Sequence, residues 1–300
     1  MSTQQAPLDP YGFDFLFIPP MSAPKLLTAM RSAAVYAELA SIAKNWEPNE
    51  IERFIYERDW NKPGPAKLRG TFHGTRDGRI IQPTHAKTIQ SRFPCSDLDL
   101  WLRHPIGQIL CNASLGQDGV LKALDTLPRG PERRCIWAEE WPSTLTATPV
   151  AREIPDTTGV VQRLAGMRTH HALLALVGRM RLNQLRTADG FMDAAYEKAL
   201  LHMLPDCIAS SPHLFLGQEA LLASVCLFLR WIPHAESRYL LQPDSYLIPS
   251  DVDERLAKAT DQINWPGLSL PPVAQLESRR TKVAEIERNL IRAIPGVCAR

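Results

Sequence analysis

The chain has 300 residues, of which 45% are hydrophobic and 22% are charged, and its formal net charge is +2. This composition is typical of a folded globular protein and excludes a disordered or collagen-like chain. The six cysteines are too widely spaced for a disulfide scaffold, the first residues lack the features of a signal peptide, and no apolar stretch is long enough to cross a bilayer. We therefore expect a soluble cytoplasmic protein with reduced thiols, no membrane contact and no cofactor.

The chain begins with a segment that is rich in proline. Five prolines fall within residues 1–24, and the aromatic residues Tyr11, Phe13, Phe15 and Phe17 alternate along it. Proline disfavours a helix, and alternation at period two is typical of extended chain. The sequence therefore predicts an extended arm over 1–24 that could lie on a protein partner.

Residues 25–126 are predicted to form a smaller N-terminal α+β part. Apolar residues recur at helical spacing over 23–45 and again over 50–60, and two short helices are expected over 96–102 and 119–124. Between them, the Asp77-Gly78 turn signal is flanked by β-branched and apolar residues and predicts a β-hairpin within 66–90. Residues 127–159 contain five prolines with little periodicity and are expected to form a connector.

The remainder of the chain, 160–300, reads as a helical domain. Helices are predicted over 160–185, 190–204, 218–231, 250–263 and 272–294. The last of these is highly charged and is expected to face solvent or a partner. The predicted fold class is therefore mainly α, with a helical C-terminal bundle and a smaller N-terminal α+β part that contains a β-hairpin.

Positive charge is concentrated in two windows of the sequence. Residues 157–188, hereafter the acid-free stretch, contain five arginines and no acid, and residues 60–94 contain seven lysines and arginines against one acid. Since the whole chain is only +2, the rest is net acidic. Segregated positive charge of this kind favours a surface that binds a polyanion.

The acid-free stretch offers three arginines on one side of a helix. If residues 160–186 formed a single helix, Arg168, Arg179 and Arg186 would point in nearly the same direction and span about 27 Å, long enough to follow several backbone phosphates. In the first window, Lys67, Arg69, Arg76 and Arg79 surround the predicted hairpin and are the other candidate phosphate contacts. Alternatively, the arginines of the stretch pair with Asp189, Asp193, Glu197 and Asp206 on the following helix.

No catalytic or metal-binding motif is well defined in the sequence. The spacing of Arg163 and His170 resembles the active-site motif of HEPN ribonucleases, which implies a histidine acid or base and an arginine that steadies the phosphate. The motif allows four to six residues between the arginine and the histidine, and Arg79 with His85 also falls in this range. We therefore keep this activity as a second alternative. Cysteine and histidine pairs at zinc-site spacing are lacking, and we predict no metal.

The sequence therefore predicts a non-catalytic subunit or adaptor of a larger cytosolic complex that binds nucleic acid, DNA or RNA, through its arginines and lysines. The first alternative is a structural subunit that contacts only proteins, through the N-terminal arm or the charged C-terminal helix. In that alternative, the basic residues serve as internal salt bridges.

Overall fold

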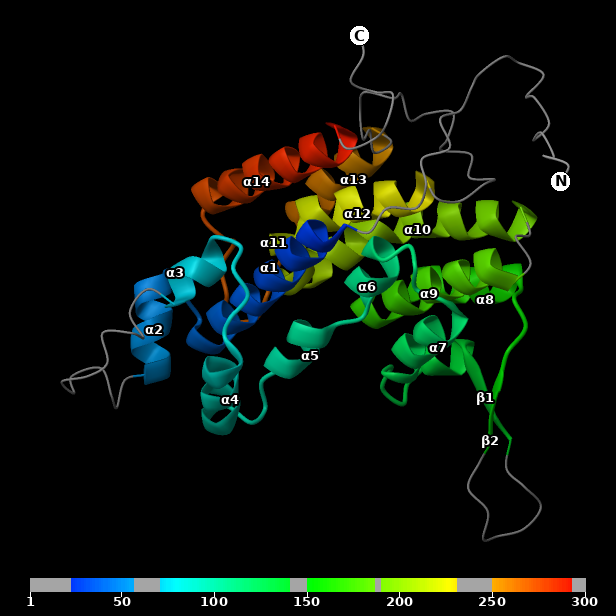
Figure 1. The fold of residues 1–300 in the computed structure, drawn as a ribbon, viewed down its shortest axis with the longest axis horizontal. Coiled ribbons are helices and arrows are strands. Elements are labelled where there is room, and N and C mark those ends of the chain that lie inside the picture. Colours follow the sequence, from blue (N-terminus) through cyan, green and yellow to red (C-terminus); the bar gives the residue numbers. More distant parts are fainter. Residues whose placement is uncertain (1–22, 57–70, 141–149, 187–189, 231–249, 293–300) are drawn as a thin grey trace, which may run out of the picture.

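Helices make up most of the computed structural model, which describes residues 23–56, 71–140, 150–186, 190–230 and 250–292 (Figure 1). The α-helices are α1 (Pro24–Ala43), α2 (Pro48–Tyr56), α3 (Thr71–Arg76), α4 (Pro83–Arg92), α5 (Leu98–Arg103), α6 (Ile106–Cys111), α7 (Gln117–Asp125), α8 (Thr158–Met167), α9 (His170–Arg186), α10 (Gly190–Ser210), α11 (Pro212–Leu216), α12 (Gln218–Arg230), α13 (Ser250–Thr260) and α14 (Val273–Arg292). A 3-10 turn, η1 (Arg133–Cys135), leads into the strands β1 (Trp137–Glu140) and β2 (Val150–Glu153).

The two strands form an antiparallel hairpin that extends away from the helices (Figure 1). Trp137 pairs with Glu153, and the pairing continues toward the base, where the Ile154 N–H donates to the Ile136 carbonyl at 2.9 Å. The prediction of a mainly α protein with a small β-hairpin is therefore confirmed.

The position of the hairpin differs from the prediction. The hairpin expected about Asp77-Gly78 is wrong, because the residues before this turn form α3 and those after it form α4. Gly78 does adopt a positive φ of 98°, so the turn exists, but it joins two helices. The observed strands lie instead at 137–140 and 150–153, within the predicted proline-rich connector.

The long helix expected over 160–185 is two helices. Arg168 adopts a left-handed conformation with φ of 54° and ends α8, and the Thr169 hydroxyl then accepts the Ala172 N–H at 3.0 Å at the start of α9. Arg168 therefore does not share a helix with Arg179 and Arg186. The prediction that these three arginines line one helical face is wrong for this reason.

Two helices, α1 and α9, are buried along much of their length. Along α1, the side chains of Leu26, Tyr36 and Leu39 are almost completely buried, and this helix packs on α5, α6, α11 and α12. The middle of α9, residues 172–183, is buried, and this helix packs against α7, α8 and α10 (Figure 1). The other helices predicted from periodicity are present with shifted ends, and α10 continues through Pro205 to Ser210.

Elements from the two predicted parts of the chain pack closely together. Because α1 contacts α11 and α12, residues before and after the predicted connector contribute to one hydrophobic cluster. The domain boundaries stay a prediction, and the predicted arm over 1–24 lies almost wholly outside the described residues. Among the helices that the structure describes, none has the length and apolar character of a membrane span.

Candidate functional site

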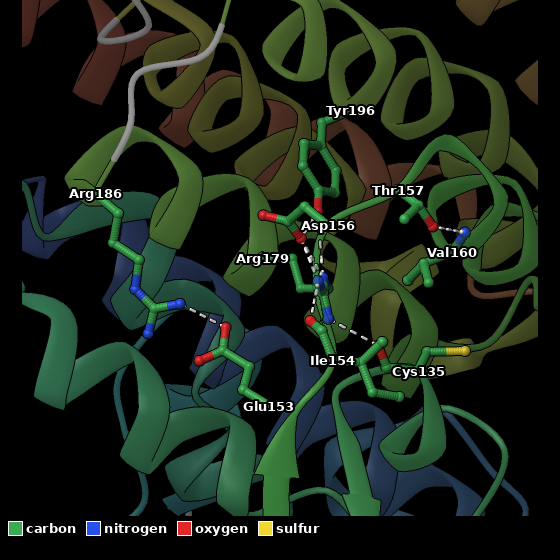
Figure 2. Close-up of polar contacts among 9 residues, drawn as sticks. All are labelled: Cys135, Glu153, Ile154, Asp156, Thr157, Val160, Arg179, Arg186 and Tyr196. Atoms are coloured by element: carbon green, nitrogen blue, oxygen red, sulfur yellow. Dashed lines mark hydrogen bonds and ion pairs between the residues drawn. The ribbon is translucent and has the colours of Figure 1, made fainter.

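Arg179 is the most completely buried of the predicted phosphate-binding residues that the structure describes, with a side chain that is 1% exposed. Its Nε donates to Asp156 Oδ1 at 2.7 Å and to the Tyr196 hydroxyl at 3.2 Å, and a terminal nitrogen also binds Asp156 (Figure 2). The remaining donors reach the carbonyls of Cys135 at 2.8 Å and Ile154 at 2.7 Å. The guanidinium of Arg179 therefore donates its hydrogen bonds to groups of the protein itself.

These partners stabilise the charged form of Arg179. Burial lowers the pKa of the guanidinium, but Tyr196 and Asp156 raise it by more, so the net pKa shift is upward. Burial raises the pKa of Tyr196, whose hydroxyl donates to Asp156 at 2.5 Å. Because the bound carbonyls flank β1 and β2, Arg179 fastens the base of the hairpin to α9 (Figure 2).

The two other arginines of the predicted row also have acidic partners. Arg186 binds Glu153 at the end of β2 at 2.6 Å, and Arg168 lies 3.3 Å from Asp206 on α10. Arg186 is 32% exposed and Arg168 is 59% exposed, so these pairs are weaker than the buried one. The structure thus brings each arginine to an acid on another element and leaves no continuous row of free cations among them.

The basic window 60–94 is described only in part. Lys67 and Arg69 lie outside the described residues, whereas Arg76 and Arg79 lie at the turn between α3 and α4. Arg76 pairs with Asp77 at 3.1 Å, and Arg79 is exposed beside it. Lys282 of α14 donates to the Asp77 carbonyl at 2.7 Å, so three cations gather at this turn.

The predicted ribonuclease pair lies in two different surroundings. Arg163 contacts the thiol of Cys135, whose pKa is raised by burial. His170 packs instead against the ring of Trp101, with centroids 5.1 Å apart, and against the ring of His171. A shared substrate position between Arg163 and His170 is not evident from these contacts, and the catalytic assignment stays a prediction.

A cluster of aromatic rings surrounds Trp101 of α5, hereafter the His–Trp cluster: Trp101, His104, His170, His171 and His213. The indole is stacked between His104 and His213, with centroid distances of 5.0 and 4.3 Å. These residues come from four parts of the chain, namely α5, the α5–α6 junction, the start of α9 and α11. Apart from His170, sequence reasoning proposed none of them for a functional role.

One histidine of the cluster is fixed by a buried acid. His213 Nε2 lies 2.7 Å from Glu38 Oε2, and the other oxygen of Glu38 accepts the Asp97 N–H at 2.8 Å. Nδ1 of His213 is 3.3 Å from the Ser211 hydroxyl. Glu38 therefore links α1 to both α5 and α11 at the edge of the cluster.

His104 is neutral and presents a proton on a defined nitrogen. Burial, with smaller effects of the neighbouring histidines and Arg31, lowers the pKa of His104 to about 3. Its Nδ1 accepts the Ile106 N–H over a long 3.4 Å, so in this neutral tautomer Nε2 carries the hydrogen. Burial and the adjacent His171 likewise lower the pKa of His170 to about 3.

A pocket opens beside the His–Trp cluster, between α1, the α5–α6 region, α11 and α12. Its cavity volume is small, about 30 Å³. Most of the lining is aliphatic, and Arg31, Trp101, His104 and His213 also line it. The cluster and pocket join residues that are remote in the sequence, so no local motif marks them.

Metal ligands are not assembled in the described part of the chain. No group of three or more His, Cys, Asp or Glu side chains there is arranged to hold a metal ion. In the His–Trp cluster the rings of Trp101, His104 and His213 meet face to face, an arrangement in which the ring nitrogens do not converge on one point.

Comparison of the chain with protein-family models, with curated proteins and with solved structures found no match.

Proposed function

We propose that this protein is a non-catalytic structural subunit of a cytosolic complex and that it contacts a protein partner. The observation that supports this proposal most directly is the internal pairing of Arg168, Arg179 and Arg186 with acids on neighbouring elements. Arginines with bound carboxylates have little positive charge left for phosphates. The acid-free stretch then stabilises the fold, as the protein-interaction alternative requires.

The outer face of α14 is the surface that best fits a partner. Gln275, Arg279 and Val283 form its buried face, and α14 packs on α12 and α1. On the opposite side, exposed residues follow one another at helical spacing: Val273, Glu277, Thr281, Glu285 and Arg288. We call these five residues the α14 outer face.

The chemistry of this face suits another protein better than a polyanion. It carries charges of both signs, and Val273 is 69% exposed at its start, next to Leu270, which is 47% exposed. Exposed apolar side chains beside mixed charges resemble the centre and rim of a protein interface. A phosphate backbone would be repelled by Glu277 and Glu285.

The test reverses the charge of the α14 outer face. Glu277→Lys with Glu285→Lys should abolish co-purification of the partner from the native host, because the complementary charges become repulsive. Asp251→Lys with Glu254→Lys on α13 makes the same charge change at exposed residues and should retain the partner. The proposal is wrong if the unaltered chain is monomeric in native extract by crosslinking and size, or if both double variants keep the partner.

A second candidate function is nucleic-acid binding at the turn between α3 and α4. The gathering of Arg76, Arg79 and Lys282 there favours it, and Lys67 and Arg69 precede it in the sequence. Fluorescence anisotropy with single-stranded RNA and duplex DNA at about 50 mM salt, where phosphate contacts are strongest, tests this candidate. Arg76→Gln with Arg79→Gln should remove such binding, whereas Arg168→Gln with Arg186→Gln should not.

A further inference from the structure

Four histidines gather around one tryptophan where α5 meets the core. The ring centroids of His104, His170 and His213 lie 5.0, 5.1 and 4.3 Å from that of Trp101. The rings of His104 and His170 are 5.6 Å apart, and the rings of His170 and His171 are 3.9 Å apart. Half of the eight histidines of the chain therefore meet in this one cluster.

The surroundings of His104 and His170 favour the neutral form of both rings. The charged or titratable groups that face His104 are His170, His171, His213 and Arg31 of α1, and those that face His170 are His171 and His213. Each of these groups would repel a proton on the ring that it faces. Burial, and to a lesser degree this repulsion, lowers the pKa of both rings to about 3.

The acids near the cluster act on the other two histidines. Glu38 of α1 lies 2.7 Å from His213, so a proton on His213 forms an ion pair. Burial lowers the pKa of His171, and Glu132 and Asp97 oppose this effect. His213 and His171 therefore have carboxylates that can compensate a proton, whereas the groups of the described residues that face the other two rings include no acid.

Water has little access to the ring nitrogens of this pair. His104 is 4% exposed, and Nε2 of both His104 and His170 is buried without a hydrogen-bond partner among the described residues. The cavity beside the cluster has a volume of about 30 Å³, which is space for about one water molecule. Hydration of a proton on Nε2 of either ring therefore requires α5 to move away from α9.

Helix α5 is the element of the cluster that buries the fewest side chains. It buries Leu98 and Trp101, whereas α9 is buried from 172 to 183. It packs on α1 and α4, and Pro94 and Cys95 before it are exposed. Elements with few buried apolar contacts open at the lowest free energy, so we expect α5 to open before the core does.

We propose that the His–Trp cluster is a pH-sensitive contact that holds the α5 segment, residues 94–103, on the core at neutral pH and releases it in acid. Opening separates Trp101 from the histidines of α9 and α11 and hydrates His104 and His170, which then bind protons. The rest of the core stays folded. This inference is independent of the protein-interaction function proposed above.

The direction of the effect follows from the pKa values of the two states. In the opened state both rings return to the ordinary pKa of 6.5, so this state takes up protons first. The contribution of His104 and His170 to closure is therefore complete above pH 6.5 and is lost as the pH falls toward 3. Between pH 7 and 5, each of the two histidines should favour opening about 25-fold, or about 600-fold together.

Amide hydrogen exchange of the full chain, corrected for the intrinsic rate at each pH, measures this opening. The protection of the α5 amides should fall about 600-fold between pH 7 and 5. Low urea should leave α5 exchange unchanged, because local opening exposes little surface. The amides of α10, which report global unfolding, should stay more protected than those of α5 at both pH values.

Phenylalanine variants assign the effect to the two rings. His104→Phe and His170→Phe each keep an aromatic ring against Trp101, and each should leave about 25-fold of the pH effect. The double variant should remove the effect, and the single variants carry the test if the double variant does not fold. His202→Gln, at an exposed position of α10, is the matched control and should keep the full change.

Three results would overturn the proposal. The first is a protection of the α5 amides that does not change between pH 7 and 5. The second is a loss of protection in α5 and α10 together with the same dependence on urea, which would mean global unfolding. The third is a pH effect that neither His104→Phe nor His170→Phe reduces.

Discussion

Replacing Arg179 with methionine should destabilise the protein far more than any substitution of a surface arginine. Methionine keeps the aliphatic part of the side chain but removes the charge and the donors. The carboxylate of Asp156 then loses its cation, and the carbonyls of Cys135 and Ile154 lose their donor. Breaking one side of a buried ion pair costs about 3–5 kcal/mol.

The partial exposure of Asp156 puts the expected loss of unfolding free energy at the lower end of this range. The Asp156 side chain is 29% exposed, so water can hydrate part of the abandoned carboxylate, and we expect about 3 kcal/mol. Arg186→Met is the matched control in the same helix, since it breaks the pair with Glu153, in which both side chains are partly exposed. That change should cost about 0.2–1 kcal/mol.

The measurement is urea unfolding followed by far-UV circular dichroism, with free energies extrapolated to water at equal slope. A cycle with Asp156→Asn isolates the pair, and a coupling of about 1–3 kcal/mol is expected for residues in direct contact. Amide exchange supplies a local readout: Arg179→Met should accelerate exchange in β1 and β2, whose base it holds.

This reasoning is refuted if Arg179→Met and Arg186→Met cost the same free energy of unfolding. It is refuted also if Arg179→Met leaves the exchange of the hairpin amides unchanged. Either result would mean that the contacts shown in Figure 2 do not carry the stability assigned to them.

Two further predictions concern acid sensitivity and helix packing. Because the folded pKa of His104 is about 3 against an ordinary 6.5, the unfolded chain takes up the proton first, so the His104 contribution to stability is full above pH 6.5 and falls by about 2 kcal/mol between pH 7 and 5. Urea unfolding of His104→Phe should reduce the pH slope by this amount and leave the part that belongs to His170, whose pKa is also lowered to about 3, whereas His202→Gln should keep the full slope. A slope unchanged in His104→Phe would assign it to other groups. A Cβ at Gly178 would lie 2.6 Å from Leu124, whereas one at Gly166 would meet nothing within 4 Å. Gly178→Ala should therefore destabilise by about 1–3 kcal/mol and Gly166→Ala should stabilise by about 0.5–1 kcal/mol in thermal melts; similar effects at both positions would contradict the packing argument.

Much of the helical fold could be predicted because apolar residues that recur at helical spacing mark the buried face of a helix. Along α1, Leu26, Met30 and Ala37 recur at helical spacing and are buried, and the helix begins at Pro24 as expected for a first turn. Sequence reasoning failed at the Asp77-Gly78 turn, where contacts with residues remote in the sequence contribute to the structure. The N–H of Phe72, at the start of α3, is satisfied by the carboxylate of Glu52 on α2, which no local pattern around the Asp77-Gly78 turn reveals.

The candidate pocket could not be predicted from sequence for a similar reason. His104 and His213 flank Trp101 although they are far apart along the chain, and Arg31 reaches the same place from α1. Each of these residues is unremarkable in its own segment. Their arrangement around Trp101 exists only in the assembled core, so no segment of the sequence reveals it.

The acid-free stretch illustrates how charge segregation in a sequence relates to charge on a surface. An arginine in a helix without acids cannot form pairs with residues three or four positions away, so its partner must come from another element. Asp156 lies one residue before the stretch begins, Glu153 ends β2, and Asp206 lies on α10. A block of like charge therefore has two opposite consequences, a polyanion-binding surface or a set of bonds between elements, and the distinction depends on burial. With Arg179 1% exposed and its guanidinium shared between an acid, a tyrosine and two carbonyls, the stretch in this protein joins the hairpin and α10 to the core.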